Sequence, residues 1–158
     1  MDTHAAARHK LERFIADKGL KHTRQRDVIL DAFFAAGGHV SVEELLRQVQ
    51  VEAPGVGAAT VYRTLKLFTE AGVAHERNFQ DGQSRYEPAL DDTHHDHLIC
   101  MDCGSIFEFE DQLIEDRQAG IAAEHGLSLQ SHRHEIYGRC TAPSTCVHRA
   151  AAEARRSA

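Results

Sequence analysis

The segment His94-His95-Asp96-His97 places four side chains with metal-binding chemistry in a row. The residues that follow are typical of a β-strand, in which successive side chains point to opposite faces. We therefore expect His95 and His97 on one face and His94 and Asp96 on the other, so that each face supplies two ligands. Because two ligands rarely hold a divalent ion, each pair needs partners, and the candidates are His39, Glu87, Glu108, Glu115 and His132.

A mixed set of His and carboxylate ligands favours Fe(II), Mn(II), Co(II) or Zn(II) over copper(I) and calcium. A polar strand exposed to solvent is the alternative interpretation of the same tetrapeptide. A catalytic metal site is another. The sequence has no His-Glu-x-x-His, no His-x-Glu paired with Pro-Cys-x-x-Cys and no obvious nucleophile motif. We therefore expect a metal-binding protein that is not an enzyme, with a metalloenzyme as the rival class.

The four cysteines indicate a second kind of metal site. Cys100 and Cys103 form a Cys-x-x-Cys pair followed by Gly104, and Cys140 and Cys146 are separated by five residues. Two close pairs with a folded segment between them can close a tetrahedral zinc site of four thiolates. A redox pair would place Cys-x-x-Cys at the start of a helix, whereas here it lies between strand-like segments. Structural zinc is the interpretation we favour over a redox pair or free thiols.

Residues 58–71 predict an amphipathic helix with one basic side. Its apolar positions recur at i, i+4 and i+7 and should face the core: Val61, Leu65 and Phe68. Tyr62, Arg63 and Lys66 then project from the opposite side, where Arg and Lys can neutralise phosphates or bond guanine edges. Further basic residues should extend the basic surface beyond this helix: Arg77, Arg85, Lys21, Arg24 and Arg26. A DNA-reading helix is favoured over a solvated face on a core helix.

The elements that position these residues divide into two groups. Helices are predicted over 4–18, from Thr23 to Gly37-Gly38, from Ser41 onward and over 58–71. Ser41 and Glu44 are expected to form a capping box at the start of the third helix. A hairpin of Val73–Phe79 and Ser84–Glu87 follows. Three helices and a hairpin are the order of a winged helix-turn-helix, here preceded by one extra helix.

Beyond a linker at residues 88–93, a second group of elements is predicted. These are strands at His95–Met101 and Ser105–Phe109, an amphipathic helix at 111–125, a long strand at Leu127–Arg139 and a helical tail from about residue 144. The chain is thus expected to be α+β, with two domains at 1–88 and 89–158.

Charge follows the same division. The 158 residues carry a net charge of −6; residues 1–80 hold 11 basic and 10 acidic side chains, and residues 81–158 hold 7 and 14. The ordinary hydrophobic content of 42% excludes a disordered chain. A net-acidic chain does not suggest nucleic acid, but a small basic face is enough. No apolar run approaches the ~18 residues that span a bilayer, and the start lacks a secretory signal, so we expect a cytoplasmic protein with no membrane partner.

With these residues in view, the chain resembles the ferric uptake regulator family of metal-dependent transcriptional regulators. The run from His94 to Gly104 looks like the metal-binding core of that family, Ala59 to Arg63 looks like its recognition helix, and His39-Val40-Ser41 looks like its hinge ligand segment. The resemblance covers roughly residues 8–148. It implies an N-terminal winged helix-turn-helix DNA-binding domain and a C-terminal α/β dimerisation domain.

By position, the resemblance implies three metal sites and a DNA-contacting set. The regulatory site would use His39, Glu87, His95, His97 and Glu108. A second site would use His94, Asp96, Glu115 and His132. The structural zinc site would use Cys100, Cys103, Cys140 and Cys146. The DNA contacts would fall on Tyr62 and Arg63, with Lys21 in the minor groove. The spacing of the last two cysteines departs from the four or two residues of several relatives, so the geometry at Cys146 has to be checked.

The resemblance further implies a repressor that controls iron-uptake genes with Fe(II) as co-repressor. Mn(II), Co(II) or Zn(II) would substitute in vitro, and Zn(II) would fill the thiolate site. The expected partners are double-stranded DNA with a palindromic operator and a second copy of the chain, with a tetramer as a further state. Peroxide, zinc and manganese sensors belong to the same family, but peroxide sensors typically carry Asp where this chain has Glu87 and Glu108. The other histidines are expected at the solvated surface: His4, His9, His22, His75, His125, His134 and His148.

Overall fold

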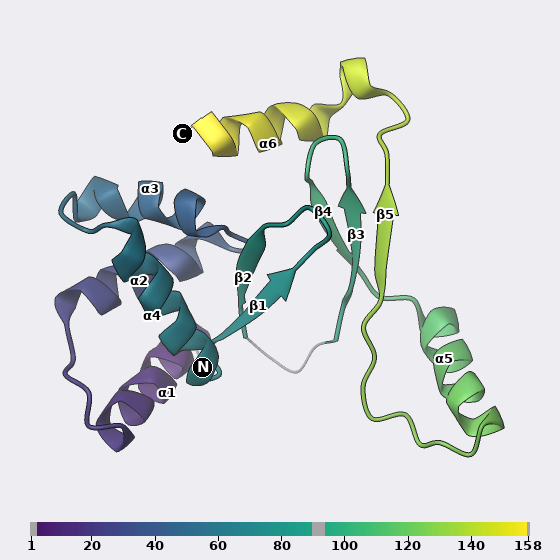
Figure 1. Ribbon diagram of the computed structural model, residues 1–158, viewed down its shortest axis with the longest axis horizontal. Coiled ribbons are helices and arrows are strands. Elements are labelled where there is room, and N and C mark those ends of the chain that lie inside the picture. The colour runs from purple at the N-terminus through teal and green to yellow at the C-terminus, as the bar shows by residue number, and fades with distance from the viewer. Residues whose placement is uncertain (1–2, 90–93, 158) are drawn as a thin grey trace. The chain divides into compact units, whose positions relative to one another are not determined.

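The computed structural model describes residues 3–89 and 94–157, without the side chains of the last three. The chain forms two compact units, Met1–Asp92 and Thr93–Ser157 (Figure 1). Most of the predicted linker at 88–93 lies outside the described residues. Among the helices that are described, none is long and apolar enough to cross a membrane.

Four helices build most of the N-terminal unit: α1 (Thr3–Asp17), α2 (Arg24–Ala36), α3 (Val42–Glu52) and α4 (Ala58–Glu70). Their starts follow the predicted capping chemistry. The side chain of Thr23 accepts a hydrogen bond from the Arg26 amide, and Ser41 and Glu44 form the complete capping box. Gly19 follows α1 with φ of +64°, a conformation in which a side chain would be strained.

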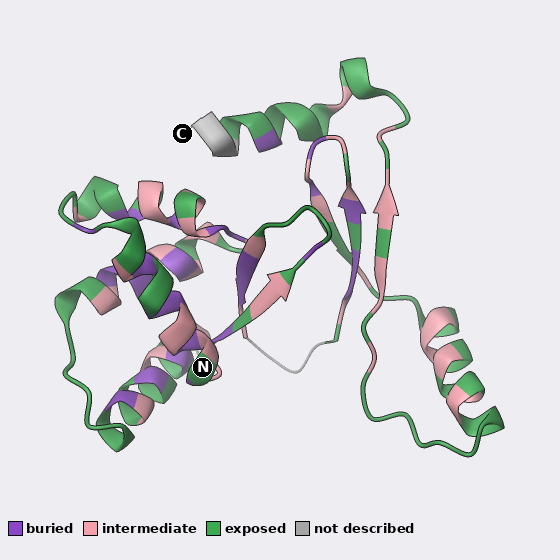
Figure 2. Ribbon diagram, in the orientation of Figure 1, coloured by how far each residue is buried: buried purple, intermediate pink, exposed green. Residues whose placement is uncertain are grey.

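The core of this unit lies between the four helices and the hairpin. Phe33, Leu45 and Phe68 are fully buried in it, and the rings of Phe33 and Phe68 lie 5.9 Å apart. Every apolar position predicted for α4 is buried, which confirms the predicted orientation of that helix. Figure 2 shows buried positions along all four helices.

The hairpin pairs β1 (Ala74–Asn78) with β2 (Ser84–Pro88) in antiparallel register. Val40 adds a single bridge to the other side of β2: its amide donates to the Tyr86 carbonyl oxygen at 2.9 Å, and the Tyr86 amide donates back at 2.8 Å. This bridge matters for function because it fixes the residue before Val40, His39, beside the residue after Tyr86, Glu87.

The C-terminal unit has a three-stranded sheet in the order β4-β3-β5, from β3 (Asp96–Cys100), β4 (Ile106–Phe109) and β5 (Glu135–Gly138). β4 is antiparallel and β5 parallel to β3. Helix α5 (Gln112–Glu124) lies between β4 and β5 in the sequence, and the short 3-10 helix η1 (Pro143–Thr145) precedes α6 (Val147–Ser157).

Two predictions for this unit were wrong. The long strand over Leu127–Arg139 is reduced to the four residues of β5, because β5 pairs only with β3 and that ladder begins at His97 opposite Glu135. Among the described residues, 127–134 therefore lie before the start of this ladder. Helix α5 forms where predicted, but none of its residues is buried, so it is not amphipathic in the sense of covering a core within this unit (Figure 2).

Candidate metal centres

The four cysteines lie in three separate segments of the chain that interact with one another. Cys146 lies near enough to Cys103 and to Cys140 to affect the pKa of each thiol, and Cys100 likewise affects Cys103. That Cys146 completes a zinc site despite the five-residue spacing stays a prediction. Burial raises the pKa of the Cys103 thiol, but its interactions with Ser105 and with the neighbouring thiols outweigh this effect and lower the pKa. The lowered pKa of Cys103 suits a zinc ligand, since the thiolate is the ligand form. The pKa of Cys140 shifts the other way: a hydrogen bond with the Ala142 backbone lowers it, but the neighbouring Cys146 and Cys100 thiols outweigh this effect and raise it.

The backbone around the first pair has the tight turn that such a site requires. The Gly104 amide donates to the Cys100 carbonyl oxygen at 2.8 Å, and Gly104 has a φ of +70°. Asp102 then joins this turn to the second pair. Its carboxylate accepts from the Cys140 amide and from the Arg139 guanidinium, both at 2.8 Å. No sequence pattern indicates this role of Asp102, which depends on a contact across 38 positions.

A second cluster forms around Asp96, which is 1% exposed. Its Oδ1 lies 3.2 Å from His94 Nε2 and 3.5 Å from His132 Nε2, and His132 Nε2 lies 3.3 Å from Glu115 Oε1. One ligand atom from each of the four residues lies within 4.8 Å of the other three. The structure thus brings together all four residues predicted for the second site, from the segment just before β3, from β3 itself, from α5 and from the segment before β5.

Two atoms of this cluster are buried without a hydrogen bond. Glu115 Oε1 and His132 Nε2 have no hydrogen-bond partner in the described part of the chain. An unsatisfied buried polar atom costs about 1–3 kcal/mol, so two of them facing one point need an explanation. A divalent cation at that point would satisfy both, and the set of two imidazoles and two carboxylates fits Fe(II), Mn(II), Co(II) or Zn(II).

The N-terminal unit holds a buried pair of ligand type beside the hairpin. His39 Nε2 lies 2.6 Å from Glu87 Oε2, and the two side chains are 6% and 4% exposed. Arg77 Nε donates to the other oxygen, Oε1, at 2.7 Å, so the carboxylate is oriented by one cation and leaves one oxygen for the imidazole. We refer to His39 and Glu87 as the N-terminal half-site.

The C-terminal unit holds a matching group on the opposite face of β3 from Asp96. The rings of His95 and His97 lie 5.0 Å apart, and His95 Nε2 lies 3.8 Å from Glu108 Oε1. Glu108 is the cross-strand partner of His97. The predicted alternation of the tetrapeptide is therefore confirmed: His95 and His97 group together, and His94 groups with Asp96. We refer to His95, His97 and Glu108 as the C-terminal half-site.

Helix α4 presents Tyr62 and Arg63 to solvent, as predicted for a DNA-reading helix. Lys21 is also exposed, just before α2. Lys66 differs, since its Nζ lies 2.5 Å from Glu76 Oε2 on β1 and its charge is compensated within the unit. The hydrogen bond that Lys66 donates to Glu76 raises the pKa of Lys66 and lowers the pKa of Glu76.

The hairpin arginines do not extend the basic edge in the way that the sequence suggested. Arg85 is 6% exposed, pairs with Asp81 at 2.6 Å and lies over the ring of Phe79. Arg77 is bound to Glu87. The physical reason is local. Acidic side chains lie within reach on the same hairpin and on its loop, so each arginine pairs with a carboxylate inside the unit instead of projecting into solvent.

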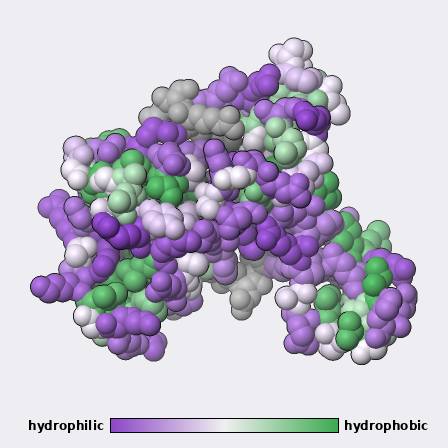
Figure 3. All heavy atoms as spheres, viewed as in Figure 1, coloured by the Kyte–Doolittle hydropathy of each residue, from purple (hydrophilic) through white to green (hydrophobic). Residues whose placement is uncertain are grey.

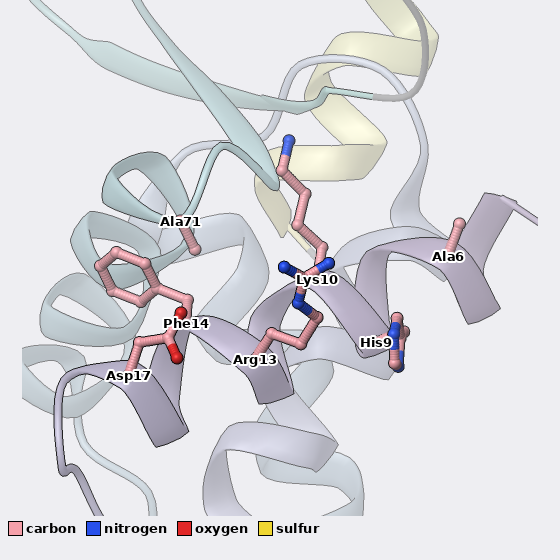
Figure 4. A pocket seen from close by; sticks show the side chains of 7 residues that line it. All are labelled: Ala6, His9, Lys10, Arg13, Phe14, Asp17 and Ala71. Atoms are coloured by element: carbon pink, nitrogen blue, oxygen red, sulfur yellow. The ribbon is translucent and has the colours of Figure 1, made fainter.

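A hollow of about 330 Å³ opens along α1 near the end of α4 (Figure 4). His9, Lys10 and Arg13 line it from successive turns of α1, and Lys10 Nζ donates to the Gly72 carbonyl oxygen at 2.7 Å. None of the predicted metal ligands is among its lining residues. The hollow is therefore separate from the residues predicted to bind metal.

A winged helix combined with clusters of imidazole, carboxylate and thiol groups defines the class of metal-responsive DNA-binding regulators. The model of the ferric uptake regulator family matches residues 17–137. A ferric uptake regulation protein of Campylobacter jejuni is 43% identical over 135 residues, which cover 82% of this chain and 85% of that protein. The chain belongs to the ferric uptake regulator family.

Solved structures agree with this assignment. The ferric uptake regulator of Helicobacter pylori, described as having three functional metal-binding sites, superposes with a TM-score of 0.84 at 28% identity and covers 93% of this chain and 97% of its own. A zinc-bound manganese uptake regulator superposes with a TM-score of 0.68 at 41% identity, with 83% and 98% covered.

Proposed function

We propose that the protein is a transcriptional repressor that binds a palindromic operator when Fe(II) is plentiful and thereby controls iron-uptake genes in the cytoplasm. The observation that carries the proposal is the pair of half-sites. His39 and Glu87 in the DNA-binding unit, and His95, His97 and Glu108 in the other unit, would together supply five ligands of the kind that Fe(II) accepts.

The two half-sites belong to two separately folded units, and this gives the mechanism. A cation shared by both half-sites would fix the angle between the units and so favour one arrangement of the DNA-binding surface. The ligands of the N-terminal half-site are held in place by their neighbours. Arg77 holds one oxygen of Glu87, and the Val40–Tyr86 bridge holds the chain beside His39, so the ligands follow the hairpin as a rigid group.

The DNA-contacting set proposed for the winged helix is Lys21, Tyr62 and Arg63. Tyr62 and Arg63 are exposed on α4, and Arg can form two hydrogen bonds to a guanine edge. Lys21, exposed before α2, would reach the minor groove. Because Lys66 is paired with Glu76, its contribution to phosphate binding should be smaller than that of Arg63.

The C-terminal unit is proposed to pair with a second copy of itself. Phe107, Leu98 and Ile136 lie opposite one another on the three strands, and each is 37–41% exposed. On α5, Leu113 and Ile121 are 80% and 44% exposed, and apolar residues are visible at the surface in Figure 3. A symmetric dimer would bury these groups and set two recognition helices at a fixed spacing, as a palindromic operator requires. Pairing of two dimers into a tetramer is the further state to test.

Two further metal sites are part of the proposal. The four thiols, Cys100, Cys103, Cys140 and Cys146, would hold structural Zn(II). The second cluster, His94, Asp96, Glu115 and His132, would hold a divalent cation within the C-terminal unit. The three functional metal-binding sites described for the Helicobacter pylori regulator support three sites here, since that chain and this one share the fold over most of their length.

Manganese sensing is the second candidate function, because a manganese uptake regulator is 41% identical to this chain. The two functions use the same ligands and differ in which cation reaches them at its cellular concentration. Glutamate rather than aspartate at positions 87 and 108 supports a metal co-repressor over a peroxide sensor.

The test is operator binding across a panel of cations. A palindromic duplex selected from random DNA in the presence of Mn(II) would be labelled, and the affinity of the full-length, zinc-loaded protein measured by fluorescence anisotropy in chelator, Fe(II), Mn(II), Co(II) and Zn(II). We expect binding to need the cation, and His39→Ala and His97→Ala to lose the response.

His75→Ala is the matched control, because His75 is exposed on β1 and belongs to neither half-site. Equal affinity in chelator and in excess metal would contradict the co-repressor function. A full metal response in both half-site variants would contradict the ligand assignment. Strong preference for Mn(II) when Fe(II) and Mn(II) are each buffered at cellular levels would favour the second candidate.

A further inference from the structure

His134 lies against the second metal cluster without belonging to the set of four that the sequence indicated. Its Nδ1 is 3.1 Å from Asp96 Oδ2 across 38 positions of the chain, and its side chain is 27% exposed. Asp96 is the most buried member of the cluster, at 1% exposed. The expectation that His134 is a solvated surface residue is therefore wrong.

The two oxygens of Asp96 are divided between two tasks. Oδ1 faces the cluster, with His94 Nε2 at 3.2 Å and His132 Nε2 at 3.5 Å. Oδ2 faces His134. The four ligand atoms that converge within 4.8 Å of one another come from His94, Asp96, Glu115 and His132, and His134 supplies none of them. His134 thus contacts the carboxylate from outside the group of converging atoms.

The backbone and a neighbouring ring hold His134 in this position. Its carbonyl oxygen accepts from the His97 amide at 3.2 Å, which attaches the segment before β5 to β3. The ring of Phe109 packs edge-on against the imidazole, with centroids 5.8 Å apart and planes at 78°. Phe109 is itself the cross-strand partner of Asp96. The imidazole is therefore fixed between β4 and the carboxylate that it contacts.

We infer that His134 is a positioning residue of the second metal site, which donates a hydrogen bond from Nδ1 to Asp96 Oδ2 and so presents Oδ1 to the cation. This inference rests on the proposed second site. A carboxylate buried at this depth needs a donor on each oxygen that binds no metal. Donors of this outer kind orient the ligand, and their loss typically costs 10- to 100-fold in metal affinity.

The test is a Co(II) titration followed by visible absorption, with a competing chelator, on full-length protein whose thiol site is loaded with zinc. The reference carries His39→Ala and His95→Ala, which remove one ligand from each half-site of the regulatory set and leave the second cluster intact. We add one of two substitutions to this reference. His134→Leu removes the donor, and His134→Asn places an amide nitrogen at nearly the position of Nδ1. Asp96→Ala identifies the second site, and His75→Leu is the matched control.

We expect Asp96→Ala to abolish the second-site Co(II) absorption and His134→Leu to weaken Co(II) binding by about 10- to 100-fold at unchanged stoichiometry. His134→Asn should recover most of the affinity, and His75→Leu should behave as the reference. Zinc content should be the same in all variants. If the Leu variant does not fold, His134→Gln takes its place: its amide reaches beyond Nδ1, so it should bind more weakly than the Asn variant.

The possible failures are distinguishable. Unchanged Co(II) binding in Asp96→Ala would overturn the second site itself. Loss of the site in Asp96→Ala together with full affinity in His134→Leu would overturn the role of His134 alone. Equal weakening in the Leu and Asn variants would show that the ring acts by packing against Phe109, and would also overturn the inference.

Discussion

The N-terminal and C-terminal units differ in what holds them together. In the N-terminal unit, 18 buried apolar residues form one cluster, with Ile29, Phe33, Leu45 and Phe68 fully enclosed. In the C-terminal unit, the buried apolar residues among those described are Ile99, Cys103 and Ala152, and α5 has no buried residue. As many of its described buried residues are polar: Asp96, His97 and Ser105.

This contrast bears on which unit can fold by itself. Burial of apolar surface, at roughly 25 cal/mol per Å², is available to the N-terminal unit from its own chain. Below about 70–80 residues, a domain with little core usually depends on metals, disulfides or oligomerisation. The C-terminal unit has four thiols, a cluster of imidazole and carboxylate groups around the buried Asp96, and exposed apolar residues on its sheet, so we expect zinc and a second copy to supply what its core lacks.

The largest expected effect therefore comes from removing zinc. Cys103→Ser should unfold the C-terminal unit and leave the N-terminal unit folded, because structural zinc contributes about 10–16 kcal/mol of apparent binding free energy to such sites. Hydrogen exchange read by mass spectrometry would check this peptide by peptide. Amides of β3, β4 and β5 should lose protection, and those of α2 to α4 should keep it.

Ser105→Ala is the control for this experiment. Ser105 accepts a hydrogen bond from Cys103 Sγ at 3.1 Å, so its loss perturbs the same thiol without removing a ligand. Zinc should stay bound in this variant. Full protection of the three strands in metal-free Cys103→Ser would contradict the comparison between the units.

The next effect in size concerns the second copy of the chain. Ile136→Asp places a charge on the exposed apolar row of the sheet, and an unpaired charge buried at an interface costs about 3–5 kcal/mol. Sedimentation velocity should show the variant shifted from dimer to monomer, with operator affinity falling in parallel. Val51→Asp is the matched control, since Val51 is 86% exposed on α3 and should leave the dimer intact. Equal sedimentation of both variants would place the interface elsewhere.

A smaller effect distinguishes the two basic residues of the recognition helix. Arg63→Ala should cost about 1–3 kcal/mol of operator affinity if Arg63 bonds a guanine edge. Lys66→Ala should cost less, because Glu76 already compensates the charge of Lys66. Anisotropy titrations with saturating cation would measure both, and a larger loss for Lys66→Ala would show that the ion pair opens on DNA. Neither variant should change the folding of the C-terminal unit.

The N-terminal unit could be predicted well from the sequence because its signals are local. The caps at Thr23 and Ser41 and the apolar positions of α4 each depend on residues a few positions apart. The same holds for the alternation of His95 and His97 against His94 and Asp96 in the metal-binding segment. Such patterns are set by the periods of the helix and the strand.

The predictions that were wrong concern contacts between distant segments or competition between nearby partners. The predicted length of β5 was wrong because β5 can pair only along the extent of β3. Arg85 was expected on a DNA-facing edge, but Asp81 and Phe79 hold it inside the hairpin. His134 and Asp102 contact partners that lie 37 or more positions away in the sequence. No residue near either of them in the sequence shows which partner it has, so only the three-dimensional structure could assign them.

The smallest expected effect tests whether charge pairs add to the stability of the N-terminal unit beyond its core. Glu76→Gln removes the partner of Lys66, and because Lys66 is 38% exposed and screened by solvent, the loss should not exceed about 0.5–1 kcal/mol. The pKa of Glu76 is lowered by the hydrogen bond from Lys66, so the contribution is present above the unfolded pKa of about 4.5. It disappears as the pH falls through the lowered pKa of the folded state.

Urea unfolding of the N-terminal unit should therefore separate the wild type from the Glu76→Gln variant at pH 6, and the two unfolding curves should converge near pH 3. A constant difference at both pH values would mean that Glu76 stabilises the hairpin through an interaction that does not depend on its charge, such as the hydrogen bond that it accepts from Tyr86, and would contradict the ion-pair contribution.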